Sequence, residues 1–401
     1  MTSPDSGDQT VLIAGAGIGG LTAALALGRT GRPVTVLERR TKVEEVGAGI
    51  QLSPNASRLL IDLGLGPALS RAAGEPKRLV IRNGESGRTL AEMPLADAMR
   101  QRYGAPYYVV HRADLQTILL DAVRGLPNVR LQFGRTVSSV DTEGDGVTVA
   151  VETASGPETA RGALLIGADG LWSRVAAAIG DHTEADFTGY VAWRATIPVG
   201  DVPPLFQKPE TGLWLGPGAH IVHYPIRGGQ VVNVVAIMKD REAERGWSRP
   251  GDAETQRRRF RNWAPELSGL LSRMDQWLVW SLFDRGPRET WTSGRVVLLG
   301  DAAHPVLPLL AQGGALAIED VAVLSRELAR TPGDVPGALR AYEARRRPRA
   351  KRVQAASRAN ATNYHLSGPF GLVRNVVLGR LSGTRLIDRY DWLYGWKPEA
   401  D

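Results

Sequence analysis

The pattern of apolar and polar residues at the start of the chain predicts a strand, a helix and a second strand. Val11 to Gly15 is an unbroken run of apolar and small residues, as in a buried parallel strand. Leu21 to Arg29 has helix-forming composition and ends at Gly31, and Val34 to Leu37 is a second apolar strand. Strand, helix and strand in this order predict a βαβ unit.

The buried-strand pattern returns at Ala163–Gly167 and at Val296–Gly300, which predicts further parallel strands of the same sheet. Residues 75–95 indicate strands of another layer. Residues 129–161 alternate in polarity and contain turn signals, which favours a short antiparallel meander. From about 186 to 285, strand-like segments with frequent tryptophans and one helix near 252–263 indicate a second sheet backed by a helix.

These patterns predict an α/β fold with a Rossmann-like cofactor-binding domain, a sheet-plus-helix substrate domain and a C-terminal helical stretch. Because the parallel-strand pattern returns late in the chain, the first domain is expected to be discontinuous. We expect it to comprise 1–75, 103–185 and 286–335. The second domain would comprise 76–102 and 186–285, and the helical stretch would cover 336–401.

Composition excludes several classes of protein. The 401 residues contain no cysteine, which excludes disulfides, thiolate metal sites and dithiol redox centres. The polar opening and the lack of an apolar run of about 18 residues predict a cytoplasmic protein that does not span a membrane. The net charge of +7 suits anionic small molecules better than nucleic acid, and the basic run Arg345–Arg352 is expected to be a solvated helix face.

The turn after the first strand carries the first candidate site. Gly15, Gly17 and Gly20 fit the pattern G-x-G-x-x-G between a strand and a helix. Gly15 permits the tight turn, Gly17 lets the backbone approach a pyrophosphate, and Gly20 lets the helix pack close to the strand. Glu38, at the tip of the second strand, can accept hydrogen bonds from ribose hydroxyls. Together these residues predict a dinucleotide site.

Two later stretches extend this site. Asp169 lies in a Gly-Ala-Asp-Gly sequence directly after the strand that ends at Gly167. Asp301 follows the strand at Val296–Gly300 and is placed to bind a sugar or ribityl hydroxyl. After a proline-containing loop, the chain enters a helix at Gly313-Gly314, where bare N–H groups and the helix dipole could meet a flat, anionic flavin ring.

At these residues the chain resembles the single-component FAD-dependent aromatic hydroxylases, which share the fold of p-hydroxybenzoate hydroxylase. The resemblance is closest to the branch of salicylate hydroxylase and 3-hydroxybenzoate 6-hydroxylase, and it covers nearly the whole chain. Besides the three cofactor motifs, the similar stretches are Glu45–Gly49, Arg102–Gly104, His111–Leu115, His223–Pro225 and Asp391–Gly395.

The resemblance implies FAD as cofactor and NADH or NADPH as a transient co-substrate. FAD would be held by Gly15, Gly17, Gly20, Glu38, Ala48, Arg112, Asp301 and Gly314, with Gly314 near the flavin ring. Asp169 would serve both FAD and the nicotinamide cofactor. No metal site is implied.

The activity implied is hydroxylation of a small, phenolic aromatic acid with O2, through a flavin hydroperoxide. Salicylate-like substrates come first, because Leu307-Pro308 resembles salicylate hydroxylases and Pro308 replaces a glutamine expected in 3-hydroxybenzoate 6-hydroxylases. We identified no arginine for the substrate carboxylate. A tailoring hydroxylase or epoxidase of a larger natural-product ring and a flavin-binding module without turnover remain alternatives, and a homodimer is the expected assembly.

The catalytic candidates lie in the second domain. Alternation along one strand puts His220 and Tyr224 on one face and His223 on the other. Related enzymes carry a functional histidine and tyrosine that match His220 and Tyr224. We therefore predict His220 as the base for the substrate phenol and Tyr224 as a pocket residue, with a hydrogen-bonded core histidine as the alternative for His220. His182 and His365 lack a motif and are expected to be surface or packing residues.

Overall fold

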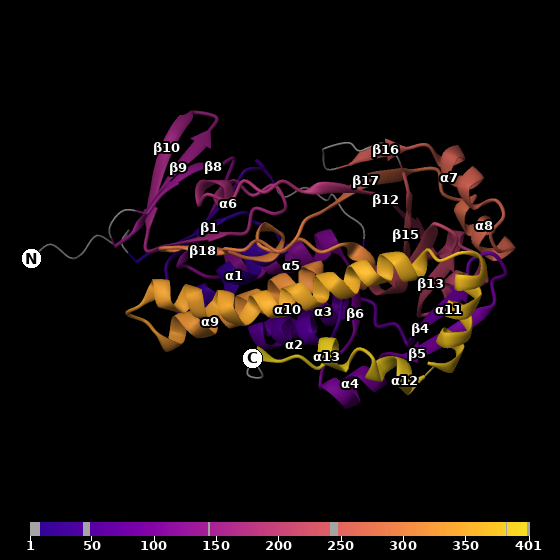
Figure 1. Cartoon of the computed structure of the whole chain (residues 1–401). Coiled ribbons are helices and arrows are strands. Elements are labelled where there is room, and N and C mark those ends of the chain that lie inside the picture. The colour runs from indigo at the N-terminus through magenta and orange to yellow at the C-terminus, as the bar shows by residue number, and fades with distance from the viewer. Residues whose placement is uncertain (1–8, 43–48, 143–144, 241–247, 382, 399–401) are drawn as a thin grey trace, which may run out of the picture.

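The structure is a computed structural model that describes residues 9–42, 49–142, 145–240, 248–381 and 383–398 (Figure 1). A six-stranded sheet lies at the centre of the first domain. Its strands, in spatial order, are β18 (Thr292–Ser293), β19 (Val296–Leu298), β11 (Leu164–Gly167), β1 (Val11–Ala14), β2 (Val34–Glu38) and β7 (Val129–Phe133). All neighbours in it are parallel except β18 and β19.

Parallel strands need crossover connections, and helices supply them here. The helix α1 (Ile18–Arg29) follows β1 and packs against α5 (Arg112–Arg124) and α9 (Gly313–Arg330). Every residue of β1 and β11 is buried, as expected for strands covered on both faces. The predicted βαβ unit and the late return of the chain to this sheet are thus present in the structure.

The expected antiparallel meander at 129–161 is wrong in its first strand. β7 pairs in parallel with β2, and only β8 (Thr136–Asp141), β9 (Val147–Thr153) and β10 (Gly156–Gly162) form the antiparallel sheet. β7 is the edge strand of the six-stranded sheet, and its residues alternate between half-buried and exposed. An edge strand with one wet face gives the same alternating pattern as a strand of a meander.

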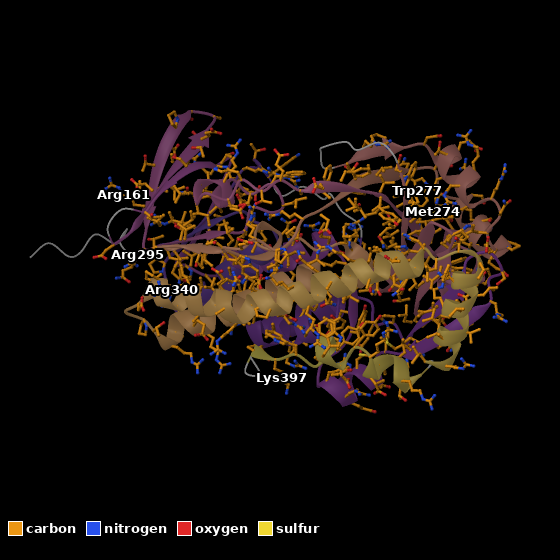
Figure 2. All side chains as sticks on the ribbon, viewed as in Figure 1. Arg161, Met274, Trp277, Arg295, Arg340 and Lys397 are labelled. Carbon is orange, nitrogen blue, oxygen red and sulfur yellow. The ribbon has the colours of Figure 1, made fainter. Side chains whose placement is uncertain are left out.

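The second sheet has eight strands. In spatial order they are β16 (Arg249–Gly251), β17 (Trp277–Asp284), β12 (Asp186–Pro198), β15 (Val231–Lys239), β14 (Ala219–Ile226), β13 (Glu210–Gly216), β4 (Arg78–Asn83) and β5 (Thr89–Pro94). One face packs on α7 (Ala253–Phe260) and α8 (Pro265–Leu271), where Trp277 and Met274 are buried (Figure 2). The opposite face meets the first domain and the C-terminal helices.

Smaller elements connect the two domains. The antiparallel pair β3 (Gly49–Leu52) and β6 (Tyr108–His111) contacts β14 of the large sheet. The remaining helices before this sheet are α2 (Pro54–Leu60) with its π-helical extension Ile61–Leu65, α3 (Gly66–Ala72) and α4 (Asp97–Tyr103). The short helix α6 (Arg174–Ala178) follows β11.

The C-terminal region is helical, as predicted. α10 (Val335–Tyr364) packs along α9 and runs across both domains (Figure 1). α11 (Gly368–Arg380), α12 (Thr384–Asp388) and α13 (Asp391–Tyr394) follow it. The strands of each large sheet fall inside the segments expected for that domain. The exact domain boundaries stay a prediction.

Candidate active site

The glycine-rich turn between β1 and α1 is shaped as the sequence predicts. Gly15 has a φ of +102°, and a Cβ there would lie 2.5 Å from the carbonyl oxygen of Ala168. At Gly20 a Cβ would collide with the carbonyl oxygen of Gly15, so the helix can approach the strand only without a side chain. A Cβ at Gly17 would meet nothing within 4 Å. The fold therefore requires Gly15 and Gly20, whereas Gly17 faces open space that a pyrophosphate would fit.

Glu38 lies at this turn. Its Oε2 accepts a hydrogen bond of 2.7 Å from the backbone N–H of Ala16, and its Oε1 accepts one of 2.9 Å from Arg40. On the other side, Gln116 of α5 donates to the carbonyl oxygen of Ala16 at 2.8 Å. A carboxylate has about four lone-pair sites, so Glu38 keeps capacity for ribose hydroxyls.

Asp301 and Arg112 form the next part of the site. The carboxyl of Asp301 is accessible to solvent, but the surrounding protein partly removes its water, which raises its pKa. The nearby cation Arg112 acts in the opposite direction and lowers that pKa. Burial lowers the pKa of Arg112, and Asp301 partly offsets this. A Cβ at Gly313 would lie 3.9 Å from Oδ1 of Asp301. Asp301, the start of α5 and the start of α9 are therefore brought together.

The carboxylate of Asp169 is used within its own loop. Its oxygens accept hydrogen bonds from the hydroxyl of Ser173 at 2.6 Å and from the backbone N–H groups of Arg174 at 2.7 Å and Val175 at 3.1 Å. These contacts hold the start of α6. Since Ala168 touches the glycine-rich turn, Asp169 shapes the loop beside the predicted cofactor site.

Hydrogen bonds made by side-chain amides fix the start of α9. The side chain of Gln312 donates to the hydroxyl of Ser53 at 2.9 Å and accepts from Asn55 at 3.0 Å. Gly314 packs against Ile50 of β3, where a Cβ would come within 2.7 Å of the Ile50 side chain. The bare N-terminus of α9 is thus fixed beside β3. Ala48, expected to lie along the cofactor, is outside the described residues.

The large sheet places Tyr224 against β3. The ring of Tyr224 lies directly over Gly49, whose backbone N–H donates to Oδ1 of Asn233 at 2.8 Å. Burial raises the pKa of the Tyr224 hydroxyl, and the nearby Gln51 acts in the opposite direction, while Oε1 of Gln51 accepts a hydrogen bond from the hydroxyl of Tyr107. No motif marks Asn233 or Gln51, because their importance comes from contacts between domains.

His220 is on the same face as Tyr224, and His223 is on the opposite face, as strand alternation predicts. His220 is 1% exposed, and its Nδ1 lies 2.8 Å from Nε2 of His365. Burial, with the neighbouring imidazole, holds the pKa of His220 well below 6.5. His223 packs edge-on against Phe206, and burial with the nearby Arg82 lowers its pKa to about 3. His182 is exposed, whereas His365 is a packing residue that contacts the predicted base.

Arg194 is a further residue of this face that no motif indicates. It pairs with Val235 across the sheet, in the same row as Val222. Its Nε is buried and has no hydrogen-bond partner among the described residues, and its guanidinium lies 5.2 Å from the ring of Trp280. Burial lowers its pKa, and the titratable groups that act on it are Tyr224 and Arg112. A single cation within the mostly apolar run 191–197 is the signal that could have identified it.

The basic run of α10 is only partly a solvated face: Lys351 and Arg352 are exposed, but the expectation is wrong for Arg346 and Arg349, which are buried. Arg346 is fully buried and donates to Glu319 and Asp320 of α9, each at 2.8 Å, and Arg349 also pairs with Glu319. Asp320 in turn accepts from Nε2 of His304 at 2.7 Å and from the backbone N–H of Gly300 at 2.9 Å. This buried ion cluster anchors the loop that carries Asp301.

The site therefore combines a glycine turn that is open at Gly17, the carboxylate of Glu38, the arginine Arg112 and two helix N-termini. This is the set of groups that a flavin dinucleotide needs. The described residues contain no cluster of histidine, aspartate and glutamate able to hold a metal ion. Within the described ranges, no helix is long and apolar enough to cross a membrane.

Comparison with known proteins agrees with this geometry. A family model described as an FAD binding domain matches residues 8–357. The chain is 36% identical over 388 residues to 3-hydroxybenzoate 6-hydroxylase 1 of Aquipseudomonas alcaligenes, covering 96% of this chain and 98% of the relative. The chain belongs to the FAD-dependent aromatic hydroxylase family.

Solved structures show the same fold over the whole length. A variant of Klebsiella pneumoniae HpxO, complexed with FAD, superposes with a TM-score of 0.85 at 28% identity, over 96% of this chain and 98% of that one. A salicylate hydroxylase in complex with its substrate gives a TM-score of 0.82 at 25% identity, over 99% and 97%. Both the α/β fold and the family resemblance are confirmed.

Membership in this family makes the protein an FAD-dependent monooxygenase, with NAD(P)H as the co-substrate typical of the family. This favours an enzyme over a flavin-binding module without turnover. When bound, FAD supplies the redox chemistry, taking electrons from the nicotinamide and activating oxygen. The protein supplies binding, orientation and the proton-transferring groups.

Proposed function

We propose that this enzyme hydroxylates a small phenolic carboxylic acid of the salicylate or hydroxybenzoate type, with O2 as the second substrate. The names of the relatives support this class. The observation that carries the proposal is a group of three polar side chains on one face of the large sheet, in three successive cross-strand rows of that face. There His220, Arg194 and Tyr224 stand among apolar side chains.

Each of the three residues has a distinct proposed role. Arg194 would pair with the substrate carboxylate, because a guanidinium without a protein carboxylate can bind one in two parallel hydrogen bonds. His220 would take the proton of the ring hydroxyl, since a phenolate is the more electron-rich ring. Tyr224 would line the pocket and hydrogen-bond the substrate through its hydroxyl, which lies near Gln51.

The proposed cofactor contacts follow from the same geometry. Gly15, Gly17 and Gly20 with Glu38 and Arg112 would hold the adenosine and phosphates of FAD. Asp301 would bind the ribityl chain, and Gly314 at the start of α9 would face the flavin ring. Ala48 would lie along the cofactor as well. Asp169, whose carboxylate is occupied by the start of α6, would act by shaping its loop.

The apolar packing of Leu307 and Leu309 is the second observation that favours a small aromatic substrate. Both are buried in one apolar cluster with Ala192, Val235 and Ile237 of the large sheet. Apolar packing around the reacting ring would keep water from the site, which limits loss of reducing equivalents to hydrogen peroxide.

The activity is tested by following NADH and NADPH oxidation by the FAD-loaded enzyme with a panel of hydroxybenzoates. Product and hydrogen peroxide are counted in the same samples. We expect salicylate or a close relative to accelerate oxidation, with product equal to the nicotinamide consumed. Peroxide without product would mean that the ring only resembles the substrate. If no member of the panel accelerates oxidation, the proposed substrate class is wrong and larger natural-product aromatics are the next to test.

Two further expectations concern the whole protein. We expect the enzyme to act in the cytoplasm, where NAD(P)H is available, and to form a homodimer. Light scattering coupled to gel filtration of the FAD-loaded protein checks the assembly, for which one chain of 43.2 kDa is the monomer value.

A further inference from the structure

A second histidine stands directly behind the proposed base. His365 follows the last residue of α10, 145 positions away from His220 in the sequence, and the two rings lie 5.0 Å apart between centroids. The 2.8 Å separation of Nδ1 of His220 and Nε2 of His365 is a hydrogen bond, which requires one proton between the two nitrogens. His365 is the outer partner, being 9% exposed against 1% for His220.

The surroundings hold this pair in place and oppose a net positive charge on it. The ring of Tyr190 from β12 lies over His365 at 5.0 Å, and that of Tyr364 from α10 lies edge-on to His220 at 5.2 Å. Among the described residues, the charged groups that act on His365 are cations from β15, α7 and α11: Lys239, Arg259 and Arg374. Burial, together with these cations, lowers the pKa of His365 to about 4. Both imidazoles are therefore neutral at pH 7.

A neutral pair has two arrangements. In one, Nδ1 of His220 carries the bridging proton, so that Nε2 of His220 has a lone pair and can accept a proton. In the other, Nε2 of His365 carries it, so that Nε2 of His220 bears a hydrogen and can only donate. The tautomer of His365 thus decides whether His220 is a base.

We propose that His365 is a positioning and proton-relay residue for His220, and this rests on the proposed function of His220 as the base. When the substrate O–H bond breaks, an N–H bond forms at Nε2 of His220. The bridging proton moves from Nδ1 of His220 to Nε2 of His365, and the proton on Nδ1 of His365 passes to water. One proton leaves the substrate and one reaches solvent, and the pair stays neutral throughout.

The relay is useful because it keeps the buried histidine pair neutral. His220 acting alone would be a poor base, because burial opposes the positive charge that it would then have to carry. Passing the proton on avoids that charge, and the new N–H on Nε2 of His220 can donate to the phenolate. Nδ1 of His365 is buried and has no hydrogen-bond partner in the described part of the chain, and a buried N–H of this kind is normally served by a bound water molecule, which would take the proton at the outer end of the relay.

Two substitutions separate the relay from simple packing. Gln in His365→Gln can place an amide near the Nε2 position and keep the hydrogen bond to His220, but it cannot pass a proton. Asn in His365→Asn reaches only the Nδ1 position and loses the bridge. The exposed His182, substituted as His182→Gln, is the matched control. FAD retention and thermal unfolding identify variants that do not fold.

The measurement is proton release when a phenolic acid binds to the FAD-loaded enzyme, followed by stopped flow with an indicator dye in weak buffer. We expect wild type and His182→Gln to release a proton on binding salicylate but none with its methyl ether. Both His365 variants should bind the ether normally, and should release the proton at least about tenfold more slowly, with kcat/KM reduced in parallel, as for loss of part of a general base.

Release at the wild-type rate in His365→Gln would overturn the relay, and loss only in His365→Asn would reduce His365 to a packing role. If wild type hydroxylates salicylate but releases no proton on binding, the relay is wrong and the proposed function stands. If wild type neither binds nor hydroxylates any phenolic acid, the proposed function fails and the relay with it. Should neither variant fold, nitrogen-15 histidine spectra of wild type must show the proton of His220 moving from Nδ1 to Nε2 on binding.

Discussion

At the scale of single residues, the glycines of the turn after β1 have different roles: the fold requires two of them, and a bound ligand would require the third. Gly20 is required because the helix backbone passes close to the strand, and Gly15 because its φ is positive. Gly17 has a φ of −74° and open space around it, so the protein itself would accept a side chain there. A methyl group at Gly17 would instead occupy the space that a pyrophosphate needs.

Gly17→Ala should therefore weaken FAD binding without weakening the fold. We expect FAD affinity to fall at least about tenfold, or about 1.4 kcal/mol, while the melting temperature of the apoprotein stays unchanged. FAD titration and thermal unfolding measure the two quantities. Gly20→Ala is the comparison and should lower both. Unchanged FAD affinity in Gly17→Ala would contradict the proposed pyrophosphate site.

Arg194 gives a second prediction at this scale. Arg194→Gln should raise the KM for salicylate by roughly 10- to 150-fold, because a hydrogen bond to a charged group contributes about 1.5–3 kcal/mol. The neutral amide of salicylate should lose little, and Arg194→Lys should be intermediate because its charge remains. Steady-state kinetics with both ligands provide the measurement. Equal losses for acid and amide would place Arg194 in contact with the cofactor instead.

At the scale of elements, the position of α9 depends on charges buried beneath it. Glu319 and Asp320 are fully buried on α9, and burial opposes their ionisation. The neighbouring His304 and Arg346 outweigh that cost at Asp320 and lower the pKa of its carboxyl to about 2. Arg346 also lies 4.9 Å from the ring of Trp396. The N-terminus of α9 and the Asp301 loop thus share one anchor with α10 and the C-terminal segment.

Arg346→Met should destabilise the enzyme strongly. It leaves two buried carboxylates short of a partner, and breaking a buried pair costs about 3–5 kcal/mol. Arg340 is on the same helix but exposed (Figure 2), so Arg340→Met should change the free energy of unfolding by no more than about 0.5 kcal/mol. Urea unfolding measures both. Similar small losses for the two variants would mean that the ion cluster adds little to stability.

At the scale of the whole molecule, buried neutral histidines link stability to pH. Burial lowers the pKa of His223 to about 3 and, with nearby cations, that of His365 to about 4, and it also lowers that of His220. In the unfolded chain all three would titrate near pH 6.5. Between about pH 6.5 and 4 the unfolded state therefore binds more protons, which favours unfolding.

The free energy of unfolding should fall as the pH drops from 7.5 to 5. Each of these histidines should contribute on the order of 2 kcal/mol at pH 5. Urea unfolding at the two pH values measures the loss. His223→Leu should reduce the pH dependence, because it removes one of the three groups, whereas the exposed His182→Gln should not. A pH dependence that is the same in His223→Leu would contradict burial of a neutral His223.

Local physical chemistry allowed the sequence alone to determine the dinucleotide-binding half of this enzyme. The strand, glycine turn, helix and acidic tip are contiguous, and each depends on neighbouring residues. For the same reason the start of α9 and the opposite faces of His220 and His223 followed from spacing alone. The family resemblance added FAD and the hydroxylase activity, which the comparisons bear out.

Only the tertiary structure decided which polar groups are buried and which partners they meet. His365 reaches His220 across 145 residues, and Arg346 of a strongly basic run is buried because α9 presents two carboxylates to it. β7 was misassigned because an edge strand alternates like a meander strand. Arg194 could be recognised as a site residue only from the sheet pairing, which places it near Tyr224. Long-range packing sets these environments, and a local pattern cannot encode it.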